Sequence, residues 1–295
     1  MSVEQMTVTL PDSLSVYVER HGHHEDRESV IVVNGSLQGT EFMRPTVRIL
    51  AERYDVVCYD PPYAARSRCG GARVPLLGWH DEAQILQSLI GRFEPDFLYS
   101  SSWGGFAALL ALSHGAGSIR RAVIGSFSPF VNDALLDLLV RVREATLAQQ
   151  DRQAVRLVNS TLGAYLPPAV KRVNRRYLLN LSRHERLQIA SHIGQILVHT
   201  PGEFVSRLEQ IRCRVSFING ELDDYTTTED GRTMARFVAH AQWTAVPEAG
   251  HFLDLEGATQ AAAWRDALFD FLGTPSSQAR CRVSTKGDRE TIRAP

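Results

Sequence analysis

The sequence predicts an α/β fold in which helices cover both faces of a mostly parallel, doubly wound sheet, with a helical lid inserted late in the chain. Two observations predict it. Short apolar runs rich in β-branched residues alternate with helical patterns along most of the chain, which is typical of parallel strands buried on both faces. One segment before the last strands is helical in pattern throughout and contains no convincing strand.

The expected strands and helices follow one another along the chain. Two alternating runs separated by Pro11-Asp12-Ser13 open it and predict a hairpin, and the polar segment His21–Arg27 then predicts a loop. We expect strands at Met6–Leu10, Leu14–Val18, Val30–Val33, Val56–Tyr59, Phe97–Ser100, Ala122–Ile124, Val215–Ile218 and Gln242–Val246. We expect core helices at Phe42–Arg53, His80–Phe93, Gly104–Ser113 and Gln260–Leu272.

These elements divide the chain into a core with one insertion. Residues 1–128 and 209–273 form the two parts of the α/β core, and residues 129–208 form the helical lid. Helical patterns in the lid cover Ala134–Ala148, Arg152–Gly163, Pro168–Leu181 and Arg186–His199, and additional helical packing is the alternative to a lid. The polar residues 274–295 predict a disordered tail.

Composition excludes several classes of function. The 295 residues carry a net charge of −1, so no overall field attracts nucleic acid or a membrane surface. No window reaches the roughly 18 apolar residues of a membrane span, and the first residues do not form a signal peptide. The four cysteines, Cys58, Cys69, Cys213 and Cys281, show no zinc-ligand spacing. We expect a cytoplasmic protein that needs no metal or organic cofactor.

Ser102 is the candidate nucleophile. It follows the strand Phe97–Ser100 and precedes a helix, which is the context of a nucleophile elbow, where small residues two before and two after let the backbones approach. Gly104 occupies the second small position, and Ser100 stands where the usual pattern has glycine. Ser100 and Ser101 are rivals that lack this spacing, and a polar strand end is the alternative interpretation.

An acid and a histidine follow Ser102 at two later strand ends. Asp223 lies just beyond the strand Val215–Ile218, with Asp224 as its rival, and His251 follows the last strand. A carboxylate there can orient a histidine, and a histidine can move the proton of the serine at neutral pH. The order Ser, Asp, His at three strand ends predicts a catalytic triad and the α/β-hydrolase fold.

The loop after the strand Val30–Val33 predicts part of an oxyanion hole. In this fold that loop supplies one backbone N–H, and the residue after the nucleophile supplies the other. The donors expected here are Ser36, with Leu37 as the alternative, and Trp103. His21 and Asp26 form an H-x-x-x-x-D spacing that some acyltransferases use, but we interpret their polar surroundings as a solvated loop.

Several further blocks are more specific than the triad. They are Val33-Asn34-Gly35, Ser102-Trp103-Gly104-Gly105, Ser126-Phe127-Ser128-Pro129, Phe217-Ile218-Asn219-Gly220, Asp224-Tyr225-Thr226-Thr227 and Gly250-His251-Phe252-Leu253-Asp254-Leu255-Glu256. In these blocks the chain resembles the rhamnolipid-pathway 3-(3-hydroxyalkanoyloxy)alkanoate (HAA) synthases, over roughly residues 14–272. It is also similar to their close relatives, the 3-hydroxyacyl carrier-protein:CoA transacylases. It departs from both at Leu37–Phe42 and at Ala65, which replaces a glycine.

The resemblance implies a covalent acyl transfer. Ser102 would take a (R)-3-hydroxyacyl group from acyl carrier protein or from a CoA thioester, and the 3-hydroxyl of a second chain would then accept it. Transfer to the thiol of CoA, hydrolysis, and ligand binding without catalysis are the alternatives. Phe130, Leu135, Leu138 and Leu139 of the lid are candidates for lining an acyl tunnel.

A basic cluster in the lid predicts where the carrier protein docks. Lys171, Arg172, Arg175 and Arg176 lie within six residues of an otherwise neutral chain. An acidic carrier protein would complement this charge, whereas a solvated helix face is the alternative interpretation. The near-neutral charge and the lack of a long apolar window predict no nucleic-acid partner and no stable membrane insertion.

Overall fold

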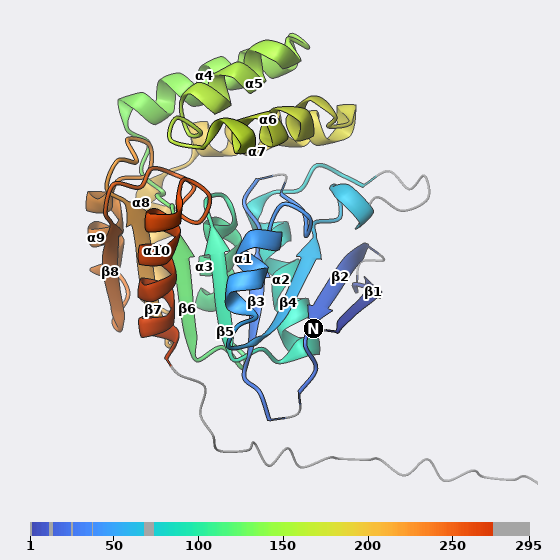
Figure 1. Ribbon diagram of the computed structural model, residues 1–295, viewed down its shortest axis with the longest axis vertical. Helices are drawn as coiled ribbons and strands as arrows, with labels where there is room; N and C mark the ends of the chain where they lie inside the picture. Colours follow the sequence, from blue (N-terminus) through green and yellow to red (C-terminus); the bar gives the residue numbers. More distant parts are fainter. Residues whose placement is uncertain (1, 12–13, 25, 37, 68–73, 274–295) are drawn as a thin grey trace, which may run out of the picture.

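The computed structural model describes residues 2–11, 14–24, 26–36, 38–67 and 74–273. The described strands form one eight-stranded sheet in the order β1-β2-β4-β3-β5-β6-β7-β8 (Figure 1). The strands are β1 (Val3–Thr9), β2 (Ser15–His21), β3 (Ser29–Val33), β4 (Asp55–Asp60), β5 (Phe97–Ser101), β6 (Arg121–Gly125), β7 (Arg214–Gly220) and β8 (Ala241–Val246). The predicted tail at 274–295 lies outside the described residues.

The sheet is mostly parallel, as the sequence predicted. β1 and β2 form an antiparallel hairpin, and β2 pairs antiparallel with β4. All pairs from β4 to β8 are parallel. The central strands β3 and β4 are buried along their whole length, which explains why their sequences are continuous apolar runs without alternation.

Helices cover both faces of the sheet and give it two apolar cores. On one face α1 (Arg44–Leu50) and α10 (Ala258–Leu272) pack around the buried Trp264. On the other face, α2 (Trp79–Phe93), α3 (Gly104–Ser113), α8 (Pro201–Leu208) and α9 (Thr228–Ala235) contribute to a second core. Every residue of the helix α3 is buried. Its almost entirely apolar sequence fits a helix that packs between the sheet and the helices α2 and α8.

Four helices form a separate layer over the carboxyl ends of the strands (Figure 1). They are α4 (Asp133–Leu147), α5 (Asp151–Ser160), α6 (Pro168–Leu179) and α7 (Arg183–Val198). We call them the helical layer. They correspond to the four helices expected between residues 129 and 208, while α8 packs beside the sheet against α3. That the helical layer opens and closes as a lid stays a prediction.

The structure differs from the sequence interpretation in a few elements. His21 belongs to β2 instead of a loop, and it pairs with Val3 of β1. The helix α1 begins only at Arg44, since the backbone from Thr40 to Met43 forms turns. The short helices α8 and α9 were not predicted. No helix among the described residues combines the length and apolar character needed to cross a membrane.

Candidate active site

Ser102 lies at the sharp turn between β5 and α3. Its φ is +50°, in the left-handed region that few residues other than glycine occupy. The Ser102 backbone N–H donates to the Gly125 carbonyl (2.8 Å), and the Ser102 carbonyl accepts from the Gly105 N–H (2.8 Å). These bonds fix a strained conformation that exposes the Ser102 hydroxyl above the end of the sheet.

The small residues around Ser102 allow two backbones to approach closely. A Cβ atom on Gly104 would lie 2.5 Å from the Asn34 carbonyl oxygen and 3.0 Å from that of Val33. Both are backbone atoms that cannot move aside without shifting the loop after β3. Ser100 is fully buried, and its Oγ has no hydrogen-bond partner among the described residues. A serine is therefore tolerated where the usual motif has glycine, at the cost of an unsatisfied hydroxyl.

We expect Gly104→Ala to destabilise the chain by about 1–3 kcal/mol and to lower its activity, because the new methyl group would push the loop after β3 away from Ser102. Gly91→Ala in α2 is the matched control, since a Cβ there meets nothing within 4 Å. It should raise stability by roughly 0.5–1 kcal/mol. Urea denaturation and turnover would be measured for both variants. If Gly104→Ala were as stable as Gly91→Ala, the close approach of the loop after β3 to Gly104 would be contradicted.

The three residues of the predicted triad lie in one hydrogen-bonded row. His251 Nε2 lies 3.1 Å from Ser102 Oγ, and His251 Nδ1 lies 2.8 Å from Asp223 Oδ2. Asp223 follows β7 and His251 follows β8, two strands that are neighbours in the sheet. The side chains of Asp223 and His251 are almost completely buried. The arrangement can move a proton from the serine to the histidine while the carboxylate orients the ring.

Asp223 is held as a carboxylate by its surroundings. Burial raises its pKa, but the positive charge of protonated His251 and the hydrogen bonds from His251 and Thr226 outweigh burial, so the pKa lies below its ordinary value. Thr226 Oγ1 donates to Asp223 Oδ2 (2.6 Å), and the N–H groups of Tyr225 and Thr226 donate to Oδ1 (3.0 and 3.1 Å). The rival Asp224 is exposed at the surface.

The loop that carries His251 is fixed by residues to which sequence reasoning gave no role. The Glu256 carboxylate accepts from the N–H groups of Gly250 and Phe252, on either side of the histidine. The hydroxyl of Ser126 donates to the His251 carbonyl (2.7 Å). Both residues belong to the sequence blocks in which the chain resembles the synthases and transacylases, so the resemblance could point to them. Their hydrogen-bond partners follow only from the three-dimensional structure.

The predicted oxyanion residues lie beside Ser102. Ser36 is in the turn after β3 and Trp103 is the first residue after Ser102, and both line the same cavity as Ser102 and His251. Neither backbone N–H donates to another residue in the described part of the chain. Asn34 Nδ2 donates to the Tyr59 carbonyl (2.6 Å) and so anchors the turn to β4. The alternative donor, Leu37, lies outside the described residues.

An apolar cavity of about 240 Å³ opens at Ser102. Its floor is formed by the carboxyl ends of the strands, and its roof by all four helices of the helical layer. The roof consists of Leu135, Leu138, Leu139 and Val142 of α4, Val158 of α5, Leu162, Asn174, Tyr177 and Leu178 around α6, and Ile189, His192, Ile193 and Ile196 of α7. Three of the four expected tunnel residues line the cavity, whereas Phe130 packs against the core.

The basic cluster lies on the outer surface of α6. Arg172, Arg175 and Arg176 are exposed, and Lys171 donates through Nζ to the Ala164 carbonyl (2.7 Å). A groove between α5 and α6 adds two basic residues that sequence reasoning did not include. Its lining includes Arg152, Arg156, Lys171, Arg172 and Arg175. None of the residues that line this groove also lines the cavity at Ser102.

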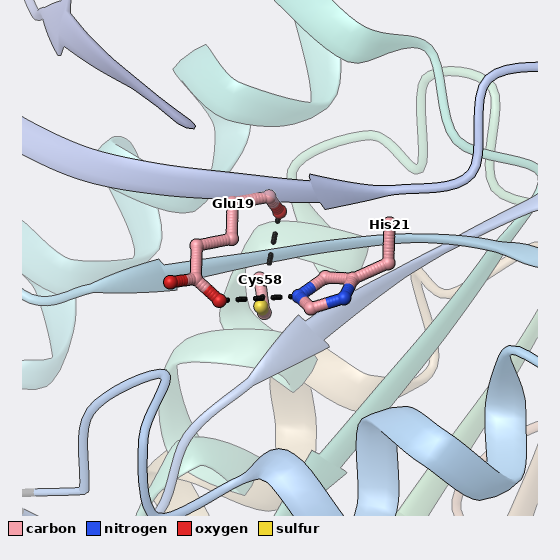
Figure 2. Close-up of side chains that lie close together, drawn as sticks. All are labelled: Glu19, His21 and Cys58. Atoms are coloured by element: carbon pink, nitrogen blue, oxygen red, sulfur yellow. Dashed lines mark hydrogen bonds and ion pairs between the residues drawn. The ribbon is translucent and has the colours of Figure 1, made fainter. Parts of the chain in front are cut away.

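The His21 and Asp26 spacing does not contribute to the site around Ser102. His21 Nε2 pairs with Glu19 Oε2 (3.1 Å), and the buried Cys58 lies beside them on β4, so the three form a group whose ligand atoms are close enough for a metal (Figure 2). Glu19 also accepts from Arg66 and from the Tyr17 hydroxyl. Burial raises the pKa of the Cys58 thiol far above its ordinary value. These pairings account for the group without a bound ion.

Comparison with protein families and relatives adds independent findings. The model of the alpha/beta hydrolase family matches residues 30–265. The chain is 36% identical over 282 residues to the (R)-3-hydroxydecanoyl-ACP:CoA transacylase of Pseudomonas putida, with 96% of each chain covered. It is 37% identical to the transacylase of the same name from Pseudomonas aeruginosa, with 94% of this chain and 93% of the relative covered.

Solved structures share the fold at lower identity. A hydrolase from Pseudomonas aeruginosa superposes with a TM-score of 0.72 at 21% identity, over 92% of this chain and 98% of the other. The alpha/beta hydrolase MGS-M2 from a deep-sea metagenome library superposes with a TM-score of 0.75 at 14% identity, over the same shares of the two chains.

Proposed function

The chain belongs to the alpha/beta hydrolase family, and from this premise we propose that it is an acyltransferase that takes 3-hydroxyacyl groups from acyl carrier protein through an acyl-Ser102 intermediate. The observation that carries the proposal is the hydrogen-bonded arrangement of Ser102, His251 and Asp223 beside an apolar cavity that the helical layer covers. The names of the relatives, which specify a 3-hydroxydecanoyl group on acyl carrier protein, support the substrate class.

The first half-reaction forms the acyl-enzyme. Ser102 Oγ attacks the thioester carbonyl carbon while His251 Nε2 takes the hydroxyl proton. The oxyanion is stabilised by the backbone N–H groups of Ser36 and Trp103. When the intermediate collapses, the C–S bond breaks, His251 returns the proton to the departing thiol, and an ester to Ser102 remains. Asp223 stabilises the protonated ring of His251 throughout.

The second half-reaction depends on the acceptor, and we propose the 3-hydroxyl of a second 3-hydroxyacyl chain. His251 takes the hydroxyl proton, the oxygen attacks the acyl-serine, the bond to Ser102 Oγ breaks, and the proton returns to Ser102. The product is an ester-linked dimer. With a free 3-hydroxy acid as acceptor it is 3-(3-hydroxyalkanoyloxy)alkanoate, and with a carrier-bound acceptor it is the thioester of that dimer, from which water releases the free acid and the carrier thiol. Most roof side chains, Leu138 and Ile193 among them, are apolar, so the cavity suits an acceptor with an alkyl chain and disfavours water.

Transfer to the thiol of CoA is the second candidate. The specific observation that favours it is the activity named for the relatives, which are ACP:CoA transacylases at 34–37% identity. In that reaction the thiolate of CoA attacks acyl-Ser102 in place of the hydroxyl. The same triad serves both acceptors, so product identity decides between them.

Product analysis by mass spectrometry tests the proposal. The purified protein would receive (R)-3-hydroxydecanoyl acyl carrier protein with and without CoA. An ester dimer formed without CoA is the expected result. Hydroxyacyl-CoA without dimer would replace the first candidate by the second, and free hydroxy acid alone would contradict both acceptors and leave a thioesterase.

Reversing the basic cluster on α6 should weaken the use of carrier-bound donors. Changing Lys171, Arg172, Arg175 and Arg176 to glutamate is expected to raise KM for the carrier-bound substrate by about 10-fold, because complementary charge speeds the encounter with an acidic partner. The KM for a small ester should not change. The matched control reverses four exposed arginines elsewhere, namely Arg48, Arg92, Arg212 and Arg236. The same KM for both quadruple variants would contradict docking at α6.

A further inference from the structure

A second buried polar network lies next to the triad and joins the helical layer to the core. Its members are Glu82 of α2, His192 of α7, Ser36 after β3, and Trp103 after the nucleophile. His192 Nε2 lies 3.1 Å from Glu82 Oε1, a close contact between opposite polarities that lacks hydrogen-bond geometry. His192 Nδ1 is hydrogen-bonded to Ser36 Oγ at 3.1 Å. No step of the proposed acyl transfer uses Glu82 or His192, although His192 lines the cavity.

Glu82 is a buried carboxylate surrounded by donors. Only 8% of the residue is exposed. Trp103 Nε1 donates to Oε2 (2.6 Å), and the Tyr63 hydroxyl donates to Oε1 (2.8 Å). Burial and the neighbouring Glu82 raise the pKa of Tyr63 well above its ordinary value, so the phenol keeps the proton that it donates. A buried carboxylate is costly unless such bonds compensate it, which indicates that this one is held in a defined position.

His192 connects this carboxylate to the loop after β3. Its side chain is 2% exposed, and its ring is stacked on Trp103 with 3.9 Å between ring centroids and an angle of 16° between planes. The negative charge of Glu82 beside Nε2 favours the tautomer that carries the proton on that nitrogen, although this N–H makes no hydrogen bond among the described residues. Nδ1 is then an acceptor, and the Ser36 hydroxyl donates to it. Both residues proposed for the oxyanion hole are thus held by the same pair, Ser36 by its hydroxyl and Trp103 by its indole.

The helix that carries His192 is itself fixed to the core. Gln188, one turn earlier on α7, is fully buried. Its amide oxygen accepts from the Leu77 N–H (3.0 Å), and its amide nitrogen donates to the Leu77 carbonyl (2.7 Å). Since residues four apart lie on the same helix face, Gln188 sets the position at which His192 meets Glu82 and Ser36.

We propose that Glu82 and His192 are positioning residues for the oxyanion hole, so that the hole is complete only while α7 is docked on the core. The inference rests on the proposed function, because it assumes that Ser36 and Trp103 supply the oxyanion donors. It goes further by making the helical layer a part of the catalytic geometry. Acyl transfer would then be fast only beneath a closed roof, where the acyl-enzyme is also shielded from water.

The test is His192→Phe, which keeps an aromatic ring on Trp103 and removes both ring nitrogens. Burst release of nitrophenol from p-nitrophenyl decanoate reports acylation of Ser102 without needing a carrier protein. The acylation rate constant is expected to fall by about 10- to 100-fold, with little change in KM. This loss is smaller than the roughly 10²- to 10³-fold loss of a whole oxyanion donor, because the donors are displaced and not removed. His184→Phe on the same helix is the matched control, since His184 does not line the cavity, and it should keep the rate of the wild type.

A double-mutant cycle separates positioning from general support of the fold. Ser36→Ala keeps the backbone N–H and removes the hydroxyl that contacts His192. If His192 acts through Ser36, adding His192→Phe to Ser36→Ala lowers the rate much less than it does in the wild-type background. Additive losses, or a higher KM with an unchanged rate constant, would overturn the inference. A normal burst without any acyl-transfer product would refute the proposed function alone, whereas no burst in the wild type would overturn both.

Discussion

Replacing Ser102 with alanine is expected to lower acyl transfer by about 10⁴-fold or more. The Ser102 Oγ is the nucleophile of the proposed acyl-enzyme, and it lies 3.1 Å from His251 Nε2. Alanine removes one oxygen and leaves the backbone turn in place, so the thermal unfolding temperature should stay close to that of the wild type. Turnover of carrier-bound substrate and the mass of the trapped acyl-enzyme would be measured together.

Ser100→Ala is the control for this loss. Ser100 is two residues from Ser102, but its Oγ is buried without a hydrogen-bond partner in the part of the chain that the structure describes. Removing that hydroxyl costs no bond, so activity should stay within a few-fold of the wild type and stability should not fall. An acyl adduct that persists in Ser102→Ala would disprove the assignment of the nucleophile.

The core of the fold could be predicted because its signals are local. The buried parallel strands are continuous apolar runs, and α3 runs from Gly104 to Ser113 in the structure as it does in the pattern. The short helix α9 begins with a capping box formed by Thr227 and Asp230, which is a local signal for the start of a helix. For α8, eight residues with a proline at the start gave too short a periodic pattern to recognise.

The candidate site could be predicted only where motif and strand end coincide. Ser102, Asp223 and His251 each follow a strand, and the parallel order of the strands brings such positions to one edge. Glu82 and His192 have no comparable signal, because each lies in the interior of a helix and they are 110 positions apart in the chain. Their contact arises from the docking of α7 on α2, which no local pattern encodes.

Replacing Asp223 with asparagine is expected to lower the transfer rate by about 10⁴-fold. The Asp223 carboxylate accepts the proton on His251 Nδ1, and an amide that turns its NH₂ toward the ring would favour the tautomer with the proton on Nε2. His251 then cannot take the proton of Ser102. The turnover rate and its pH profile would be measured. Asp224→Asn is the matched control, because the neighbouring acid is exposed, and it should change the rate by no more than a few-fold.

The same variant should also change the stability of the chain in a pH-dependent way. The pKa of Asp223 in the folded chain lies below its ordinary value, because the attraction of His251 and the hydrogen bonds outweigh the effect of burial. The carboxylate therefore contributes stability that is fully present above the unfolded pKa of about 3.9 and is lost as pH falls through the lower folded pKa. Asp223→Asn should be less stable than the wild type at pH 7, and the difference should shrink as the pH falls below about 4. Urea denaturation of both proteins between those pH values measures this difference. If the difference in stability between the two proteins stayed the same at every pH, the ionised carboxylate would not stabilise the fold. Its bonds to Thr226 and His251 would then serve only to orient the histidine.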